Sequence, residues 1–439
     1  MRSKVITAVA VAGALIAGAG AVVAGPGSPT HDPSIPVAPT GVFSPRRTPG
    51  VLSEAVGEIR LGAALNSVLT DARFADVEDS SCLLVRKGGT TVFQRDPDRS
   101  VVPASTLKLV TAWAALKRFG AGHRFSTEVR APARPNGGAV ERLWLVGGGD
   151  PLLATAPYTA RFFNQPQIST SMEALADRVK AAGVVEVSGP LLGDDGRFDS
   201  VRYLASWKEA YVLDSDVGPV SPLVVNDNFV TWGAKDVPAA DPAVHGASVL
   251  RDLLRDRGVK AEGPAARGAA PVGSVLIATI SSPPMSALVT EMLSESDNLT
   301  AEVLVKAMGQ AFGRGGSWPA GLEVIKATVS KSGLAVGSLT QLDGSGLERD
   351  NRLNCRLLIS VLEDPEVGAA LFAGLPVAGE TGTLSTRLTE EGVRGKIRAK
   401  TGSLDFVAGL VGFAESPAGP LSFAVVGNGL PLSARAGRD

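Results

Sequence analysis

Three short polar motifs, in a fixed order, constrain this chain more than any other feature of its sequence. The first, S-T-L-K at residues 105–108, opens a run of apolar residues with helical spacing. The second, S-D-N at 296–298, stands before another such run. The third, K-T-G-S at 400–403, follows a short segment that is typical of a strand. Taken singly, each motif is explained more simply as a helix start, a helix cap or a strand end. Each occurs once, and their combination in this order favours one catalytic site assembled from three distant segments.

The first motif predicts a hydroxyl beside an amine. Ser105 and Lys108 lie three residues apart, about one helical turn, so both face the same side of the helix. A serine hydroxyl becomes a useful nucleophile when a base takes its proton, and an amine can do so when burial or a neighbouring cation lowers its pKa. We therefore expect Ser105 to be the nucleophile and Lys108 its base. The backbone N–H groups of Ser105 and Ser403 are expected to form an oxyanion hole.

The other two motifs supply candidates for proton transfer and substrate binding. Ser296 and Lys400 can help to relay a proton, and the amide of Asn298 can hold a substrate carbonyl or the amine of the first motif. Lys400 and Thr401 can face a substrate carboxylate. Gly402 leaves room for a ligand to approach the strand closely.

Composition agrees with a globular enzyme and excludes several other classes. The 439 residues are 20 % charged and 44 % hydrophobic, which is ordinary for a chain with a large core. A formal net charge of −1 argues against nucleic acid as the main partner. The chain has 3 His, widely spaced, and 2 Cys, so we expect neither a histidine-rich metal site nor a cysteine zinc module. The serine mechanism that the motifs favour needs neither a metal ion nor an organic cofactor.

The first 50 residues predict export. Residues 1–25 begin with two positive charges and continue as an uncharged run rich in Ala, Val and Gly, which is typical of a secretory signal. The run is near the ~20 residues that span a bilayer, so an uncleaved membrane anchor is the alternative. Residues 26–50 contain seven Pro and predict an extended linker. We therefore expect the protein in the extracytoplasmic cell envelope, secreted or attached to the membrane through its N-terminus.

Longer stretches around the motifs resemble the D-Ala-D-Ala carboxypeptidases of the PBP4 type, low-molecular-mass penicillin-binding proteins of peptidase family S13. The resemblance covers roughly residues 80–430 and rests on six stretches: VPASTLKLVTAWAAL, WLVGGGDPLL, SGPLLGDDGRFD, PVSPLVVNDN, LDGSGLERDNRL and AGETGTLSTRL. Glu348 and Glu380 depart from the residues usual in that family, and neither lies in one of the three motifs.

The resemblance implies an α/β (α+β) fold, with a serine β-lactamase/DD-peptidase-like domain whose antiparallel sheet is flanked by helices. Ser105 and Ser296 are 191 residues apart, a much longer gap than in a β-lactamase, so an inserted region must lie between them. We assign residues 51–121 and 281–439 to the catalytic domain. Residues 122–280 are assigned to a mainly β insertion with some helix.

The resemblance also implies the reaction and its partners. A serine DD-carboxypeptidase of this family removes the terminal D-Ala of peptidoglycan stem peptides through an acyl-enzyme, here on Ser105, and β-lactam antibiotics inhibit it by acylating the same hydroxyl. Three alternatives stay open: a DD-endopeptidase acting on peptidoglycan cross-links, a serine β-lactamase or esterase, and a non-catalytic penicillin-binding scaffold of the wall. The spacing disfavours the β-lactamase, and the complete set of motifs disfavours the scaffold.

Two pairs of residues have structural interpretations. Cys82, in a predicted strand, and Cys355, in a predicted helix over 354–362, are candidates for one disulfide because an exported chain folds in an oxidising compartment. Sequence spacing alone does not bring them together, so their pairing stays open. Asp343 and Ser345 stand in a D-G-S-G stretch and are interpreted as turn residues rather than catalytic ones.

Overall fold

The computed structural model describes residue 57 and residues 61–67, 80–164, 167–334, 338–416 and 419–430. The predictions for residues 1–25 and 26–50 lie outside these ranges. Most of a helix expected over 53–71 also lies outside them, although residues 61–67 are helical. None of the helices in these ranges combines the length and the apolar character of a membrane span.

A five-stranded antiparallel sheet forms the centre of the main body. Its strands, in spatial order, are β15 (Ile397–Leu404), β16 (Val407–Ala414), β17 (Leu421–Asn428), β1 (Ser81–Lys87) and β2 (Thr90–Arg95). Gly88 and Gly89, both with positive φ, form the turn of the β1–β2 hairpin. Leu83, Leu84 and Val85 are all buried, although alternate side chains point to opposite faces, so the sheet is covered on both sides.

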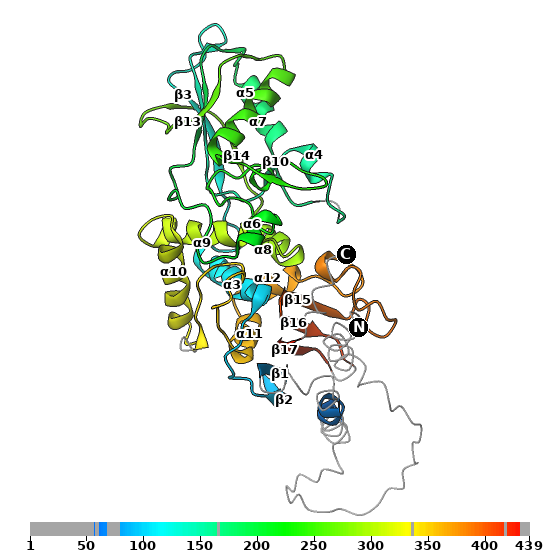
Figure 1. Cartoon of the computed structure of the whole chain (residues 1–439). Helices are drawn as coiled ribbons and strands as arrows, with labels where there is room; N and C mark the ends of the chain where they lie inside the picture. Colours follow the sequence, from blue (N-terminus) through cyan, green and yellow to red (C-terminus); the bar gives the residue numbers. More distant parts are fainter. Residues whose placement is uncertain are drawn as a thin grey trace, which may run out of the picture.

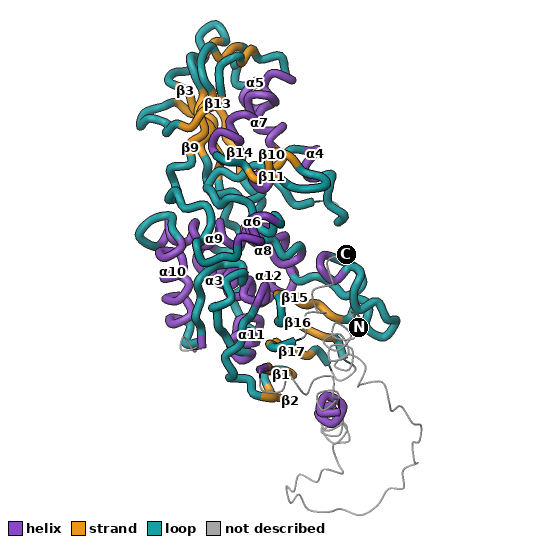
Figure 2. The backbone as a smooth tube through the Cα atoms, in the orientation of Figure 1, coloured by secondary structure: helices purple, strands orange, loops and turns teal. Residues whose placement is uncertain are grey.

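Helices cover one face of this sheet, and Figure 2 shows them gathered beside the strands. They are α3 (Lys108–Phe119), α8 (Met285–Ser294), α9 (Asn298–Phe312), α10 (Trp318–Lys331), α11 (Cys355–Leu362) and α12 (Gly368–Gly374). A smaller apolar layer that includes Leu65, Leu384 and Leu388 covers the other face. A disulfide joins Cys82 of β1 to Cys355 at the start of α11. The expected antiparallel sheet flanked by helices is confirmed.

The chain between α3 and α8 forms a second body, at the opposite end of the molecule from β1 and β2 (Figure 1). Its largest sheet has the order β13 (Ala265–Arg267), β9 (Leu191–Asp194), β5 (Leu143–Val146), β3 (Ser126–Ala131) and β14 (Val275–Ser281). Both parallel and antiparallel pairs occur in it. The apolar faces of α5 (Met172–Ala181) and α7 (Pro242–Asp256) share one core with this sheet.

Smaller elements complete the second body. The short strands are β4 (Ala139–Val140), β6 (Leu153–Ala154), β7 (Thr170–Ser171), β8 (Glu186–Val187), β10 (Phe229–Thr231), β11 (Val237–Pro238) and β12 (Lys260–Ala261). The short helical segments are α4 (Ala156–Thr159) and the 3-10 turn η4 (Asn226–Asn228), whereas α6 (Glu209–Leu213) lies beside α8 and α9 of the main body (Figure 1). Two other 3-10 turns, η3 (Ala104–Leu107) and η6 (Gly382–Leu384), belong to the main body.

The second body is joined to the main body through neighbouring strands. Ser126 at the start of β3 is opposite Ser281 at the end of β14, so the chain enters and leaves at one place. One part of the expected insertion nevertheless packs into the main core, through Phe198, Trp207 and Tyr211. This returning segment brings residues near 216 to the first turn of α9.

Candidate active site

Ser105 stands where η3 passes directly into the buried helix α3. The preceding residue, Ala104, has a φ of +48°, which is unusual for a residue with a Cβ. Two glycines allow the chain to be held there. A Cβ on Gly346 would lie 2.0 Å from the Ala104 carbonyl oxygen, and one on Gly402 would lie 2.9 Å from the Pro103 carbonyl oxygen. Ser105 is therefore fixed between a glycine-containing turn and strand β15.

The amine of Lys108 is fully buried and has three oxygen acceptors. Its Nζ donates to Ser105 Oγ at 3.1 Å, to Asn298 Oδ1 at 2.6 Å and to the Ser345 carbonyl oxygen at 2.8 Å. These acceptors come from three segments that are far apart in the sequence. Together they fix the position of the amine beside the hydroxyl of Ser105.

The second motif lies at the start of α9. Asp297 is the N-cap of this helix, and its carboxylate accepts hydrogen bonds from two backbone N–H groups of the first turn. Ser296 precedes it with a φ of +62°, so its backbone lies outside the right-handed helical range. The Asn298 amide is occupied at both ends, because its Oδ1 accepts from Lys108 and its Nδ2 donates to the Asp216 carbonyl oxygen at 2.7 Å. Of the two roles expected for this amide, the contacts fit holding the lysine.

Lys400 forms a second serine–lysine pair. Its side chain is fully buried, and Nζ donates to Ser296 Oγ at 2.8 Å and to the Thr401 carbonyl oxygen at 2.9 Å. Burial, reinforced by the positive charges of Lys108 and Arg387, holds the pKa of Lys400 well below its usual range. The amine therefore releases a proton more readily than an exposed lysine would.

The third motif lies within a strand rather than at its end. The sequence predicts that residues 400–403 close a strand over 397–399, but β15 continues to Leu404 and pairs with β16 along its whole length. Gly402 is opposite Gly409, and a Cβ on either would come within 2.9 Å of the Thr106 methyl group. The glycine thus serves the close approach of η3 and does not end the strand.

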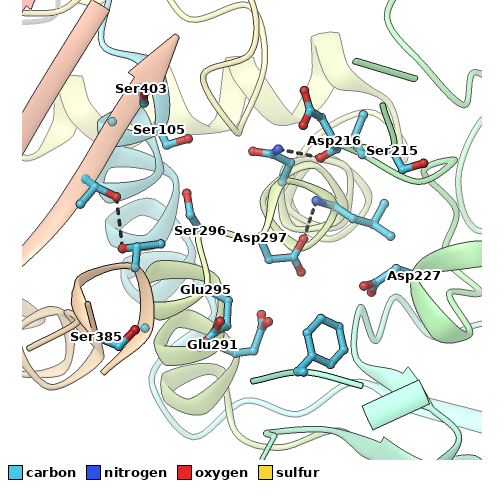
Figure 3. A pocket seen from close by; sticks show the side chains of 18 of the residues that line it. Ser105, Ser215, Asp216, Asp227, Glu291, Glu295, Ser296, Asp297, Ser385 and Ser403 are labelled. Carbon is cyan, nitrogen blue, oxygen red and sulfur yellow. Dashed lines mark hydrogen bonds between the residues drawn. The ribbon is translucent and has the colours of Figure 1, made fainter. Parts of the chain in front are cut away.

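A cavity of about 640 Å³ opens in front of these groups. Figure 3 shows Ser105, Ser296 and Ser403 together at one end of it. Thr401 lines the same end, and its hydroxyl donates to Thr383 Oγ1 at 3.1 Å. Hydroxyl groups therefore surround the space next to the nucleophile.

The opposite end of the cavity is acidic, with carboxylates of Asp227, Glu291 and Asp297 around a common space (Figure 3). Burial, reinforced by Asp297, raises the pKa of Asp227 to about 7. Burial and the carboxylates of Asp297 and Asp227 raise the pKa of Glu291 well above its ordinary value. In the part of the chain that the structure describes, no three His, Cys, Asp or Glu side chains are grouped so that they could hold a metal ion.

The cavity also contains residues that sequence reasoning did not assign to the site. Phe162 and Phe229 come from the second body, and no local pattern identified them. Arg387 also lines the cavity, and it forms no salt bridge with any described carboxylate. Burial lowers the pKa of Arg387. Its position in the stretch TLSTR, shortly before the third motif, was the available signal.

The structure brings all eight expected catalytic and binding residues to this site: Ser105, Lys108, Ser296, Asn298, Lys400, Thr401, Gly402 and Ser403. Two serine–lysine pairs beside a helix-flanked antiparallel sheet define a class of serine acyl-transfer proteins that includes penicillin-binding proteins and class A β-lactamases.

Comparison with known proteins identifies the family within this class. The sequence profile of the D-Ala-D-Ala carboxypeptidase 3 (S13) family matches residues 61–240 and 234–439. The D-alanyl-D-alanine carboxypeptidase of Actinomadura sp. (strain R39) is 28 % identical over an alignment of 447 residues in length. The alignment covers 83 % of this chain and 80 % of that protein. The chain belongs to the S13 family of D-Ala-D-Ala carboxypeptidases.

Solved structures share the fold. Penicillin binding protein 4 (dacB) from Haemophilus influenzae aligns with a TM-score of 0.69 and 21 % identity, over 82 % of this chain and 92 % of that one. A predatory endopeptidase from Bdellovibrio bacteriovorus, in complex with an immunity protein, aligns with a TM-score of 0.51 and 15 % identity, over 80 % and 86 % of the two chains.

Proposed function

We propose that this protein is a serine DD-carboxypeptidase that removes the terminal D-Ala of peptidoglycan stem peptides and is inhibited by β-lactams. The observation that carries the proposal is the contact of 3.1 Å between Ser105 Oγ and the buried Nζ of Lys108, at the end of a cavity with a second serine–lysine pair. Membership of the S13 family supports the substrate class.

In the first step, Ser105 Oγ attacks the carbonyl carbon of the penultimate D-Ala, and Lys108 takes the hydroxyl proton. The carbonyl oxygen becomes negative as the tetrahedral intermediate forms. The backbone N–H groups of Ser105 and Ser403 are the proposed donors to that oxygen, since β15 passes closely beside η3.

In the second step, the C–N bond of the intermediate breaks and the departing D-Ala nitrogen receives a proton. Ser296 is the proposed donor, and Lys400 restores its proton through the contact of 2.8 Å. The lowered pKa of Lys400 supports this role, because an amine that is readily deprotonated can exchange protons with a hydroxyl. Water then hydrolyses the ester: its oxygen bonds to the acyl carbon, the C–O bond to Ser105 breaks, and Ser105 Oγ takes one proton of the water. The proton that Lys108 gained returns to Lys400 through solvent, so both lysines are restored.

The substrate carboxylate is assigned to the end of the cavity that β15 borders. Thr401 and Ser403 offer hydroxyl groups there, and Arg387 offers a positive charge with no described carboxylate partner. Lys400 was expected to face the carboxylate directly. Because its Nζ is engaged by Ser296 and the strand backbone, we assign it a contribution through its charge alone.

Mass spectrometry after exposure to penicillin tests the proposal. We expect one adduct, on the peptide that contains Ser105, and no adduct in the Ser105→Ala variant. An adduct elsewhere, or retained binding in the variant, contradicts the assignment. Release of D-Ala from a monomeric stem peptide by the wild-type protein would distinguish an enzyme from a non-catalytic scaffold. Slow loss of the penicillin adduct would distinguish a carboxypeptidase from a β-lactamase.

A DD-endopeptidase activity is the second candidate, because the cavity is large for a single leaving D-Ala. It extends past Ser296 to Asp227 and Phe229 of the second body. A cross-linked muropeptide has a longer leaving group that would occupy this space. Product analysis with monomeric and cross-linked muropeptides distinguishes the two activities.

The remaining assignments concern the ends and the insertion. We propose that residues 1–25 export the chain to the extracytoplasmic envelope, as a cleaved signal or as an anchor, and that 26–50 act as a linker. We keep 51–121 and 281–439 as the catalytic domain and 122–280 as the insertion. The returning segment around Trp207 and Tyr211 supports the catalytic domain from within that insertion.

A further inference from the structure

A buried carboxylate on α9 reaches Lys108 indirectly, through the turn at residues 343–346. Glu302 is four residues after Asn298, so both side chains lie on the same face of α9. Asn298 contacts the amine directly at 2.6 Å. Glu302 is fully buried and contacts the turn that supplies the amine with another acceptor.

Glu302 holds this turn by its backbone N–H groups. One carboxylate oxygen accepts from Ser345 N at 2.7 Å, and both accept from Gly344 N, at 3.0 and 2.9 Å. Oε2 also accepts from Trp318 Nε1 at 2.7 Å. The carbonyl oxygen of Ser345 is the acceptor for Lys108 Nζ at 2.8 Å. The same residue is therefore held on one side by Glu302 and contacts the catalytic amine on the other.

The peptide unit between Ser345 and Gly346 is hydrogen-bonded at both ends. Its carbonyl accepts from Lys108, and its N–H donates to Asp343 Oδ1 at 2.9 Å. Hydrogen bonds in such a chain polarise one another. Any shift of the turn thus changes both the position and the strength of the acceptor.

We propose that Glu302 is a positioning residue for acyl transfer, which fixes the 343–346 turn so that the Ser345 carbonyl directs the Lys108 amine toward Ser105. This inference rests on the proposed function, because it assigns Glu302 a role in the step that Lys108 performs. Asp343 and Ser345 keep their interpretation as turn residues, and the turn acquires a role in orienting the base.

Glu302→Gln is the informative substitution. Glutamine has nearly the same shape, but its Nε2 cannot accept a hydrogen bond, so one of the donors that now face the carboxylate loses its acceptor. If Nε2 replaces the oxygen that faces Ser345 N, two donors face each other and the turn must move. If it replaces the other oxygen, Nε2 faces both Trp318 Nε1 and Gly344 N, so the turn is disturbed in this orientation too.

Asp364→Asn is the matched control. Asp364 also accepts from a tryptophan Nε1, that of Trp113 at 2.8 Å, and from two backbone N–H groups, those of Glu366 and Val367 at 2.9 and 3.1 Å. Among the described residues, Asp364 contacts neither Lys108 nor the 343–346 turn. Its loss affects stability through the same kinds of bonds, with an ion pair to Lys117 at 3.4 Å in addition. Thr111→Val is a second probe, because Thr111 Oγ1 donates to the Gly344 carbonyl oxygen at 2.8 Å from another side of the turn.

The experiment measures acylation of the full chain by penicillin over a range of concentrations, which separates the dissociation constant of the initial complex from the acylation rate constant. We expect Glu302→Gln to lower the rate constant about 10- to 100-fold, with the dissociation constant within about twofold of wild type. Asp364→Asn should leave both values unchanged. If Glu302 only stabilised the fold, its substitution would not lower the acylation rate constant selectively while the dissociation constant stayed unchanged.

The inference is overturned if Glu302→Gln acylates at the wild-type rate, if Asp364→Asn slows acylation equally, or if only the dissociation constant changes. Should Glu302→Gln fail to fold, Thr111→Val decides: a fall of about threefold or more in the rate constant supports the inference, and an unchanged rate constant refutes it. Failure of the wild-type protein to form any adduct refutes the proposed function instead.

Discussion

Gly402→Ala tests whether the close approach of β15 to η3 positions the nucleophile. The new Cβ would lie 2.9 Å from the Pro103 carbonyl oxygen and from the Thr106 methyl group, about 0.5 Å closer than the 3.4 Å at which ordinary contacts begin. Because Pro103 and Thr106 flank Ser105, the strand and the serine must move apart. Overpacking of this kind costs about 1–3 kcal/mol of stability. A displacement of about 1 Å in an active site can cost about 100-fold in rate, so half of that predicts a loss of about tenfold.

The assay combines thermal unfolding with the rate of acylation by a fluorescent penicillin. Gly392→Ala is the control, because a Cβ there meets nothing within 4 Å. We expect Gly402→Ala to unfold at a lower temperature and to acylate about tenfold more slowly than Gly392→Ala. Equal acylation rates in the two variants would refute the argument that this contact aligns Ser105 with β15.

Three further predictions concern the disulfide, a buried acid and the cavity wall. Replacing Cys82 and Cys355 by Ser removes a link across 273 residues and should lower the free energy of unfolding by about 3–5 kcal/mol, measured by denaturant titration. Burial raises the pKa of Asp150 from 3.8 to about 6, so its proton stabilises the fold below pH 4 and this contribution is lost as the pH rises through 6. We expect the free energy of unfolding, measured with urea, to fall between pH 4 and pH 7 by up to about 3 kcal/mol less in Asp150→Asn than in the wild type. An unchanged pH dependence in the variant contradicts this prediction. Arg387→Gln should raise KM about tenfold or more for a peptide ending in a D-Ala carboxylate but leave KM for its C-terminal amide unchanged; equal effects on both peptides contradict carboxylate recognition.

The parts of the site that chemistry alone requires could be predicted from the sequence. A serine needs a base and a developing oxyanion needs donors, so residues such as Ser105, Lys108 and Lys400 were identifiable from their types, spacing and order. The helices at these motifs were also predictable, because their apolar spacing and their caps are local features. Asp297 provides the cap of α9, and Gly120 ends α3 with a φ of +84°.

The parts that depend on packing between distant segments could not be predicted. Residues 400–403 were expected to close a strand, and Gly402 to leave room for a ligand. No local signal shows that η3 instead approaches the middle of β15. Trp207 lies in the expected insertion yet packs in the main core. There its indole N–H donates a hydrogen bond to Asp343 Oδ2 at 3.1 Å. Glu302 had a weak signal, because it is a carboxylate within the mostly apolar stretch TAEVLV. A buried charge of this kind requires partners, which only the fold identifies.

The low histidine content of the sequence agrees with the composition of the site, because neither of the two described histidines lines the cavity. His123 stacks against Phe119 with ring centroids 4.6 Å apart, and His245 Nε2 lies 3.2 Å from the Val225 carbonyl oxygen. Neither ring lines the cavity, and in the described chain the basic groups that contact Ser105 and Ser296 are the amines of Lys108 and Lys400. Amines suit this role only when the fold controls their surroundings, because an exposed lysine is charged at neutral pH. Here the start of α9 contributes to the surroundings of both lysines. Ser296, just before the helix, contacts Lys400, and Asn298, in its first turn, contacts Lys108. A displacement of this one helix would therefore disturb acylation and leaving-group protonation together.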